Sequence, residues 1–187
     1  MAYIGKNPTS VPLTSSDITD GIIGIADLSA TGTKDATTFL RGDNSFAEAG
    51  GGKVLQVVQT TLTTLLSTTS ASFVEASGFN VAITPSATSS KVLVMVSTTM
   101  NNSGGAGNAN VTIARGSSVL QANGFAFHSQ ASGESYSFSS SSAFNYLDSP
   151  NTTSATTYKV YFSAENGTGK LNYNNAVGTI TAMEIAG

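Results

Sequence analysis

The side chains able to do acid–base or metal chemistry are few. His128 is the only histidine, and Glu134 is the closest carboxylate to it along a serine-rich region. A catalytic site or a metal site needs further groups in a defined geometry, and nothing near His128 forms a known motif. We therefore expect His128 to be a surface or inter-subunit residue. Without cysteine, disulfide and thiolate chemistry are excluded.

Carboxylates do not pair in any motif typical of a glycosidase, because the few acidic residues are dispersed along the chain. A fold can still bring two distant carboxylates together. The sequence nevertheless predicts a protein that is not an enzyme, with no cofactor and no metal.

Hydroxyl groups alternate with aromatic rings over residues 135–146, with serines dominating residues 137–142. A sugar-binding surface uses such groups, since hydroxyls bond to hydroxyls and rings stack on C–H faces. The same alternation is also typical of a strand with one exposed face. We favour the strand.

Two short glycine-containing motifs have ordinary explanations. Arg41-Gly42-Asp43 is the tripeptide that integrins recognise, but Gly and Asp are common turn formers. We predict a turn there, between Phe39 and Phe46. The glycines of residues 104–107 lack the Lys-Ser/Thr that completes a phosphate-binding loop, so a loop tip is expected.

The composition favours strands over helices or disorder. Of 187 residues, 40% are hydrophobic and only 10% are charged, with Ser and Thr in place of charges. Residues 53–187 carry five basic and five acidic side chains, so no basic face exists for nucleic acid. The sequence has no basic amphipathic helix and no apolar run of roughly 20 residues, so no membrane partner is expected. No secretion signal is visible at the N-terminus.

Residues 29–47 read SATGTKDATTFLRGDNSFA, and three glycines follow at residues 50–52. This segment resembles ATGTPSSTTFLRGDNTWA, a form found just before the distal domain in many short fibre proteins of tailed bacteriophages. Lys34-Asp35 replaces the usual Pro-Ser, and Phe46 replaces the usual Trp. The opening residues 2–8, AYIGKNP, also look like the start of many phage tail proteins. The resemblance implies a virion protein made in the host cytoplasm.

In this interpretation the chain has three parts: a virion anchor at 1–28, an extended stem and Gly-rich linker at 29–52, and a β head at 53–187. The first two parts have too few apolar residues for a core of their own. Phe39, Leu40 and Phe46 form one apolar knot in the stem. The expected anchoring side chains are Tyr3, Ile4, Ile22, Ile23 and Leu28.

Residues 53–187 predict eight or nine strands of an all-β sandwich or jelly roll. Residues 91–100, KVLVMVSTTM, are apolar on both faces, which indicates a strand buried on both sides. A Gly/Asn loop is predicted over residues 101–108. Residues 165–169 give a hairpin signal, and residues 178–185 make the last strand. The ending resembles phage fibre heads, which are similar in plan to the trimeric jelly rolls of tumour-necrosis-factor and C1q type.

We expect a homotrimer, because packing three copies would cover both faces of residues 91–100 and the apolar groups of the stem. Host contact is expected on loops at the end of the head farthest from Lys53. The candidate receptor-facing residues are Asn101, Asn102, Asn108, Ser132, Glu134, Asn151, Thr152, Asn166 and Thr168, and the candidate stacking aromatics are Tyr136, Tyr146 and Tyr173.

Three functions are open at this point. The first is a homotrimeric tail fibre or spike that binds other virion proteins through its N-terminus and a host surface glycan or protein through its head. The second is a head fibre or capsid decoration protein that stabilises the capsid. The third, a polysaccharide depolymerase, predicts a longer chain and a groove of clustered acidic residues, and this chain offers neither.

Overall fold

The computed structural model describes residues 31–33, 36, 38–48, 53–104, 107–122, 124–127 and 137–187. Contacts divide the chain into two compact units, Met1–Gly51 and Gly52–Gly187. The predicted anchor at 1–28 lies outside the described residues, as do His128, Ser132, Glu134 and Tyr136.

The first unit contains a short hairpin. Its strands β1 (Thr38–Leu40) and β2 (Phe46–Glu48) are antiparallel, with Leu40 opposite Phe46. Between them, the Asn44 amide donates to the Arg41 carbonyl at 3.0 Å, and Asn44 has a φ of 60°. Asparagine tolerates this left-handed conformation. The turn predicted between the two aromatics is therefore confirmed.

Asp43 fixes the end of this turn. Its carboxylate accepts bonds from the Ser45 hydroxyl at 2.6 Å and the Ser45 amide at 3.1 Å. These two bonds hold the pKa of Asp43 below its ordinary value. Asp43, the acidic residue of Arg41-Gly42-Asp43, thus stabilises the turn.

Residues 31–33 lie against β2. The Phe46 amide donates to the Thr31 carbonyl at 2.7 Å, and Gly32 has a φ of 91°. A Cβ at Gly32 would meet the Phe46 carbonyl oxygen, so only glycine fits. Phe39 and Leu40 are 63% and 48% exposed, so a single copy does not close the expected apolar knot.

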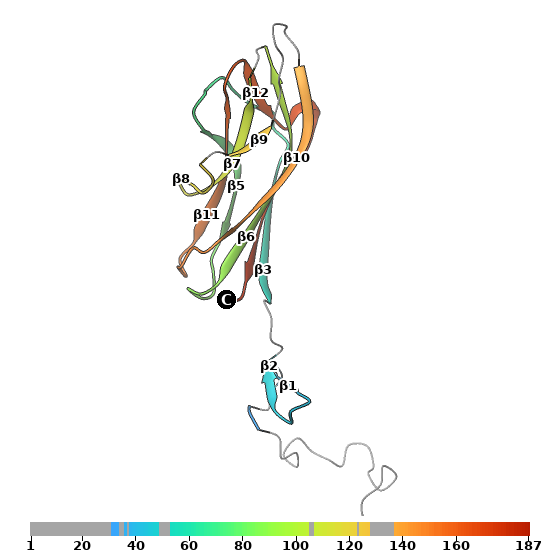
Figure 1. Cartoon of the computed structure of the whole chain (residues 1–187), viewed down its shortest axis with the longest axis vertical. Helices are drawn as coiled ribbons and strands as arrows, with labels where there is room; N and C mark the ends of the chain where they lie inside the picture. Colours follow the sequence, from blue (N-terminus) through green and yellow to red (C-terminus); the bar gives the residue numbers. More distant parts are fainter. Residues whose placement is uncertain are drawn as a thin grey trace, which may run out of the picture. The chain divides into compact units, whose positions relative to one another are not determined.

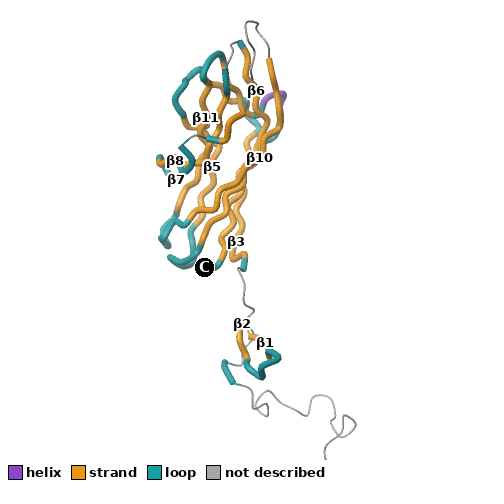
Figure 2. Tube along the Cα trace, viewed as in Figure 1, coloured by secondary structure: helices purple, strands orange, loops and turns teal. Residues whose placement is uncertain are grey.

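The second unit is a sandwich of two antiparallel sheets (Figures 1 and 2). The six-stranded sheet contains β3 (Val54–Leu62), β4 (Leu66–Thr68), β6 (Lys91–Ser103), β10 (Ser137–Asp148), β12 (Thr168–Leu171) and β13 (Gly178–Ile185). The five-stranded sheet contains β5 (Val74–Ile83), β7 (Ala109–Arg115), β8 (Ser118–Val119), β9 (Phe125–Phe127) and β11 (Thr156–Ala164). The predicted all-β, jelly-roll-like sandwich is confirmed.

The strand β6 organises the six-stranded sheet. One of its edges pairs with β10 from Val92 to Ser103, and the other pairs first with β13 and then with β12. Strand β13 in turn pairs with β3, and β12 with β4. The only 3-10 turn among the described elements, η3 (Tyr173–Asn175), joins β12 to β13.

Alternate residues of the two sheets meet in the core. Strand β6 contributes Val92, Val94 and Val96, and the five-stranded sheet contributes alternate residues of β7 and β11. The period of two in a strand places every second side chain on one face. The fully buried side chains of these rows include Val111, Ile113, Tyr158 and Val160.

The predicted loop at 101–108 begins too early. Strand β6 continues to Ser103, and Asn101 and Asn102 are 0% and 1% exposed. Asn101 Nδ2 donates to the Ser137 and Ser139 hydroxyls, and Asn102 Nδ2 donates to the Gly107 carbonyl. The assignment of Asn101 and Asn102 as receptor-facing loop residues is therefore wrong, because strand neighbours on both sides cover them.

The hairpin predicted at 165–169 is also wrong. Strands β11 and β12 belong to different sheets, so residues 165–167 cross from one layer of the sandwich to the other. The Glu165 amide donates to the Asn108 carbonyl at 2.8 Å, and Gly169 lies opposite Asn102. A turn signal marks the reversal of the chain but not the sheet that the next strand joins.

Strand register shows which loops share an end of the sandwich. Asp148 lies opposite Val92, and Ile185 lies opposite both Lys91 and Val54, close to Lys53. The candidate loop at 149–154 is therefore at the Lys53 end. Asn108, Asn166 and Thr168 lie at the opposite end, where β6 ends and β12 begins.

Candidate recognition surface on the six-stranded sheet

The outer face of the six-stranded sheet carries an apolar band at its Lys53 end. The band is one cross-strand row of four residues, Val57, Met183, Leu93 and Leu147, which are directly opposite one another in register. Val57 and Leu147 are 53% and 49% exposed, and Leu93 and Met183 are half-buried. Residues 91–100 are thus covered on one face only, and the second apolar face predicted from sequence is open in a single copy.

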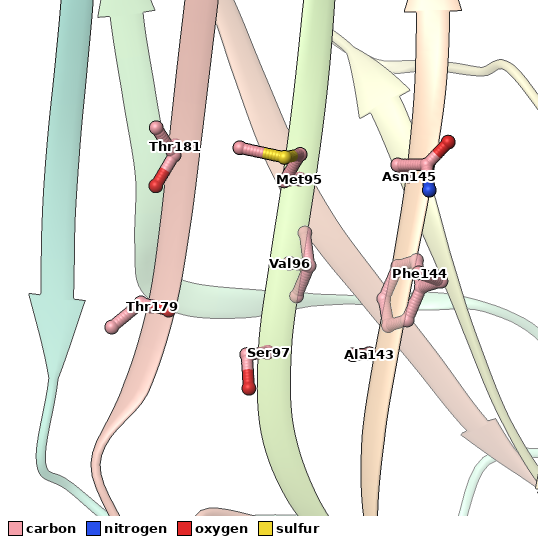
Figure 3. A pocket seen from close by; sticks show the side chains of 8 residues that line it. All are labelled: Met95, Val96, Ser97, Ala143, Phe144, Asn145, Thr179 and Thr181. Atoms are coloured by element: carbon pink, nitrogen blue, oxygen red, sulfur yellow. The ribbon is translucent and has the colours of Figure 1, made fainter.

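A shallow groove follows the band along the same face (Figure 3). It has a volume of about 320 Å³ and crosses β13, β6 and β10. Small side chains floor it, because Ser97 lies opposite both Thr179 and Ala143. Met95 and Asn145 lie at its edge toward the band. The surface therefore changes from apolar to mixed within two residues of the band.

A second depression, which we call the polar hollow, lies farther from Lys53. It has a volume of about 200 Å³ and is lined by Thr99, Ser139, Ser140, Ser141, Tyr173 and Asn174. Every lining residue has a hydroxyl or an amide, and none has a charge. Along β6 the hollow begins six residues beyond Leu93, a distance of about 20 Å.

The turn that presents Tyr173 is held by a buried asparagine. Asn172 is 0% exposed, and its Nδ2 donates to the carbonyls of Leu62 and Thr64 at 3.0 and 3.1 Å. Its Oδ1 accepts a bond from the Thr98 hydroxyl at 2.9 Å, and its amide donates to the Thr99 carbonyl. Every polar atom of the side chain is used, so the start of the turn is fixed.

Asn172, Asn174 and Asn175 all have φ between 56° and 59°. Left-handed backbone is unfavourable for most L-residues, and asparagine is among the few that visit it. Clusters of such residues occur at ligand sites, where the surrounding structure holds the strain. Here the three asparagines surround Tyr173.

Lys170 lies at the rim of the polar hollow. Its Nζ donates to the Ser103 hydroxyl at 3.1 Å and lies 5.4 Å from the centroid of the Tyr173 ring. Among the described residues, no carboxylate lies within ion-pair distance of Lys170. One face of the Tyr173 ring therefore carries a cation.

Two buried carboxylates in the sandwich serve structure. Asp148 accepts bonds from the Tyr158 hydroxyl at 2.7 Å and from Arg115 Nη1 at 3.0 Å. Burial, reinforced by the bond to Asp148, raises the pKa of Tyr158. Burial also raises the pKa of Glu184, but bonds from Ser86 and Gln56 outweigh it and lower that pKa to about 2. Neither carboxylate lines the groove or the polar hollow.

The described residues contain no group of three or more His, Asp or Glu able to hold a metal ion. They also contain no helix long and apolar enough to cross a membrane.

Of the sequence-predicted candidates, the structure brings Tyr173 to the polar hollow. Tyr146 packs half-buried against the core beside Val94, away from the far end. Asn151 and Thr152 lie at the Lys53 end, while Asn108, Asn166 and Thr168 lie at the far end. Thr99, Asn174 and Lys170 were not predicted from sequence, because only the fold brings them to this site: Thr99 lies opposite Ser141, the turn after β12 carries Asn174, and Lys170 lies over Tyr173. The dense asparagines at 172–175 were the available signal.

Comparison with known proteins gives little. No family model matches the sequence, and no curated protein matches it. Among solved structures, a chain of T=1 particles derived from infectious bursal virus is similar at 12% identity and a TM-score of 0.38, over 90% of this chain and 44% of that one. The D431N mutant of VP2 gives 14% identity and a TM-score of 0.37, over 74% of this chain and 38% of that one. The chain thus spans about two fifths of the length of these capsid chains, and at such scores the likeness carries no argument about function.

Proposed function

We propose that this chain is a homotrimeric virion structural protein, a phage tail fibre or spike whose β head contacts the host surface. The observation that carries the proposal is the apolar band directly after the fibre-like segment. The band begins at Val57, four residues beyond Lys53, on a sheet face that becomes polar only toward its far end. Soluble monomers seldom leave such a row open, and open apolar patches commonly mark association sites.

The occupant proposed for the band is a second and a third copy of this chain. The band is uncharged, so identical bands meet without repulsion. Copies joined through residues 1–52 would hold their bands at high effective concentration, which favours even a modest apolar contact. Separately, association of the stems of three copies would cover Phe39 and Leu40, which a single copy leaves exposed.

The mass in solution tests the trimer. Light scattering of the full-length protein should give about three times 19 kDa. Leu147→Lys should shift the mass toward that of the monomer, because it places a charge in the band. Leu65→Lys is the matched control, since Leu65 is also about half exposed, at 51%, but lies in the loop after β3. A monodisperse parent monomer at micromolar concentration would refute the trimer, and equal effects of both variants would refute the role of the band.

The position on the particle tests the fibre. Immunogold labelling or cryo-EM of intact virions should place the protein on the tail. Labelling over the capsid would replace this proposal with a head fibre or capsid decoration protein. The proposed role needs no catalytic group, so repeated release of reducing ends from host polysaccharide would contradict it.

A further inference from the structure

We propose that the polar hollow is a saccharide-binding site, with Tyr173 as its stacking ring. This inference rests on the proposed function, because it names the class of host ligand and the site that takes it. The hollow lies at the end of the sandwich opposite Lys53, about 20 Å along β6 from the apolar band. Association through the band and binding in the hollow therefore use different parts of one sheet face.

The hydrogen-bonding groups of the hollow suit sugar hydroxyls. The Ser139 hydroxyl already accepts a bond from Asn101 Nδ2 at 2.9 Å, which leaves its own proton to donate outward. The Thr99 hydroxyl donates to the Tyr173 carbonyl at 2.9 Å, which leaves its oxygen to accept. Donors and acceptors thus alternate across two neighbouring strands, as the hydroxyl groups of a sugar ring require.

The ring of Tyr173 completes the site. Lys170 Nζ lies over the ring at 5.4 Å from its centroid, so a sugar can stack only on the other ring face. Tyr173 is half-buried rather than fully exposed. An aromatic ring of this kind offers a large contact surface with few torsions to fix on binding.

The site is held in shape before any ligand arrives. Asn172 fixes the start of the turn through four hydrogen bonds, and Asn174 and Asn175 continue it in left-handed backbone. A preformed turn lowers the ordering cost of binding. Asn172, Asn174 and Asn175 all adopt the strained left-handed conformation. This strain is explained if the turn must hold the Tyr173 ring in one orientation.

Other ligand classes fit less well. A nucleic acid or a phosphorylated group needs several cations, but none of the described lining residues is a cation, and Lys170 over the Tyr173 ring adds one. An apolar ligand would not use the proton that the Ser139 hydroxyl can donate outward. A saccharide satisfies both the hydroxyl groups and the ring.

The test uses the full-length protein on an array of immobilised bacterial lipopolysaccharides and capsular polysaccharides, with host cells assayed in parallel. The parent should bind saccharides on the array and bind host cells. Tyr173→Ala should weaken both by about tenfold or more, since stacking supplies a contact of this size. Ser139→Val should also weaken both, because it replaces the hydroxyl by methyl groups that cannot bond to a sugar.

Tyr161→Ala is the matched control, because Tyr161 is a half-buried tyrosine on β11 in the other sheet. It should bind as the parent does, and thermal melts of all three variants show whether each has folded. If the parent binds host cells but Tyr173→Ala and Ser139→Val, both folded, bind equally well, the saccharide site is wrong and the fibre proposal stands. If the parent binds neither cells nor any saccharide, the host-contact role and the saccharide site are both overturned. If Tyr161→Ala weakened binding as much as Tyr173→Ala does, the assignment of the saccharide site to the polar hollow would also be overturned.

Discussion

Replacing Glu184 by glutamine is expected to destabilise the β head and to remove part of its acid sensitivity. Glu184 is 1% exposed on β13. One carboxylate oxygen accepts bonds from the Ser86 amide and hydroxyl, both at 2.7 Å, and the other accepts from Gln56 Nε2 at 2.6 Å. These bonds fasten the loop before β6 to both β13 and β3.

The magnitude follows from these three bonds. A glutamine can keep its oxygen toward Ser86, but its NH₂ group then faces the NH₂ group of Gln56. One charge-assisted bond is lost and two donors oppose each other, which costs about 2–3 kcal/mol. For a domain of this size, that lowers Tm by roughly 10 °C.

The pH dependence gives a second, independent signature. Since the pKa of Glu184 is lowered from 4.5 to about 2, its stabilisation is present above pH 4.5 and is lost as the pH falls toward 2. The gap corresponds to at most about 3 kcal/mol, and solvent screening reduces it. Glutamine does not titrate, so the stability difference between parent and variant should shrink over this interval.

Thermal melts by circular dichroism at fixed protein concentration, from pH 7 to pH 2.5, measure both effects. Glu75→Gln is the control, because the exposed pair of Glu75 with Lys159 at 2.8 Å should contribute less than about 1 kcal/mol. A Glu184→Gln protein that melts with the parent at pH 7, or whose deficit stays constant down to pH 2.5, would refute this reasoning.

Three further changes test the packing of the head. Gly178→Ala should lower Tm by several degrees, because a Cβ there would meet Oδ1 of the buried Asn172; a melt equal to the parent would show that the turn can move aside. Tyr158→Phe should cost about 1 kcal/mol in urea unfolding with an unchanged slope, because it removes the 2.7 Å bond to Asp148; no loss would mean that the bond contributes nothing net. A chain beginning at Lys53 should keep a cooperative, β-rich melt, since the sandwich has its own core; an unfolded product would contradict the division at residue 52.

The sequence predicted where the strands lie better than it predicted which strands pair with one another. The period of two in 91–100 correctly predicted a strand with an apolar row on each face, but a single copy buries only the row of Val92, Val94 and Val96. Sheet membership is decided by contacts far apart along the chain. The turn at 165–167 therefore looked like a hairpin and proved to be a crossing between sheets.

Buried asparagines were the other source of error. Asn101 and Asn102 have the composition of a loop, and propensity alone assigns them to one. In the structure the Asn102 amide bonds to the nearby Gly107 carbonyl, and the Asn101 amide bonds to Ser137 and Ser139, which are more than 30 residues away in sequence. Polar residues enter a sheet when such partners exist, and a single sequence does not show the partners.

The outward positions of β6 connect the two proposals. From the Lys53 end they are Leu93, Met95, Ser97, Thr99 and Ser103, with Asn101 between the last two covered by its neighbours, so one strand passes from apolar through small to polar side chains. An apolar row extended to the far end would bury the hollow between copies, and a polar row at the Lys53 end would leave the copies without an apolar contact. Association next to the stem and recognition away from it require this order along the strand. The inward positions Val92, Val94 and Val96 are all apolar, and the first polar inward residue is Thr98. These side chains face the core, which takes no part in either proposed function.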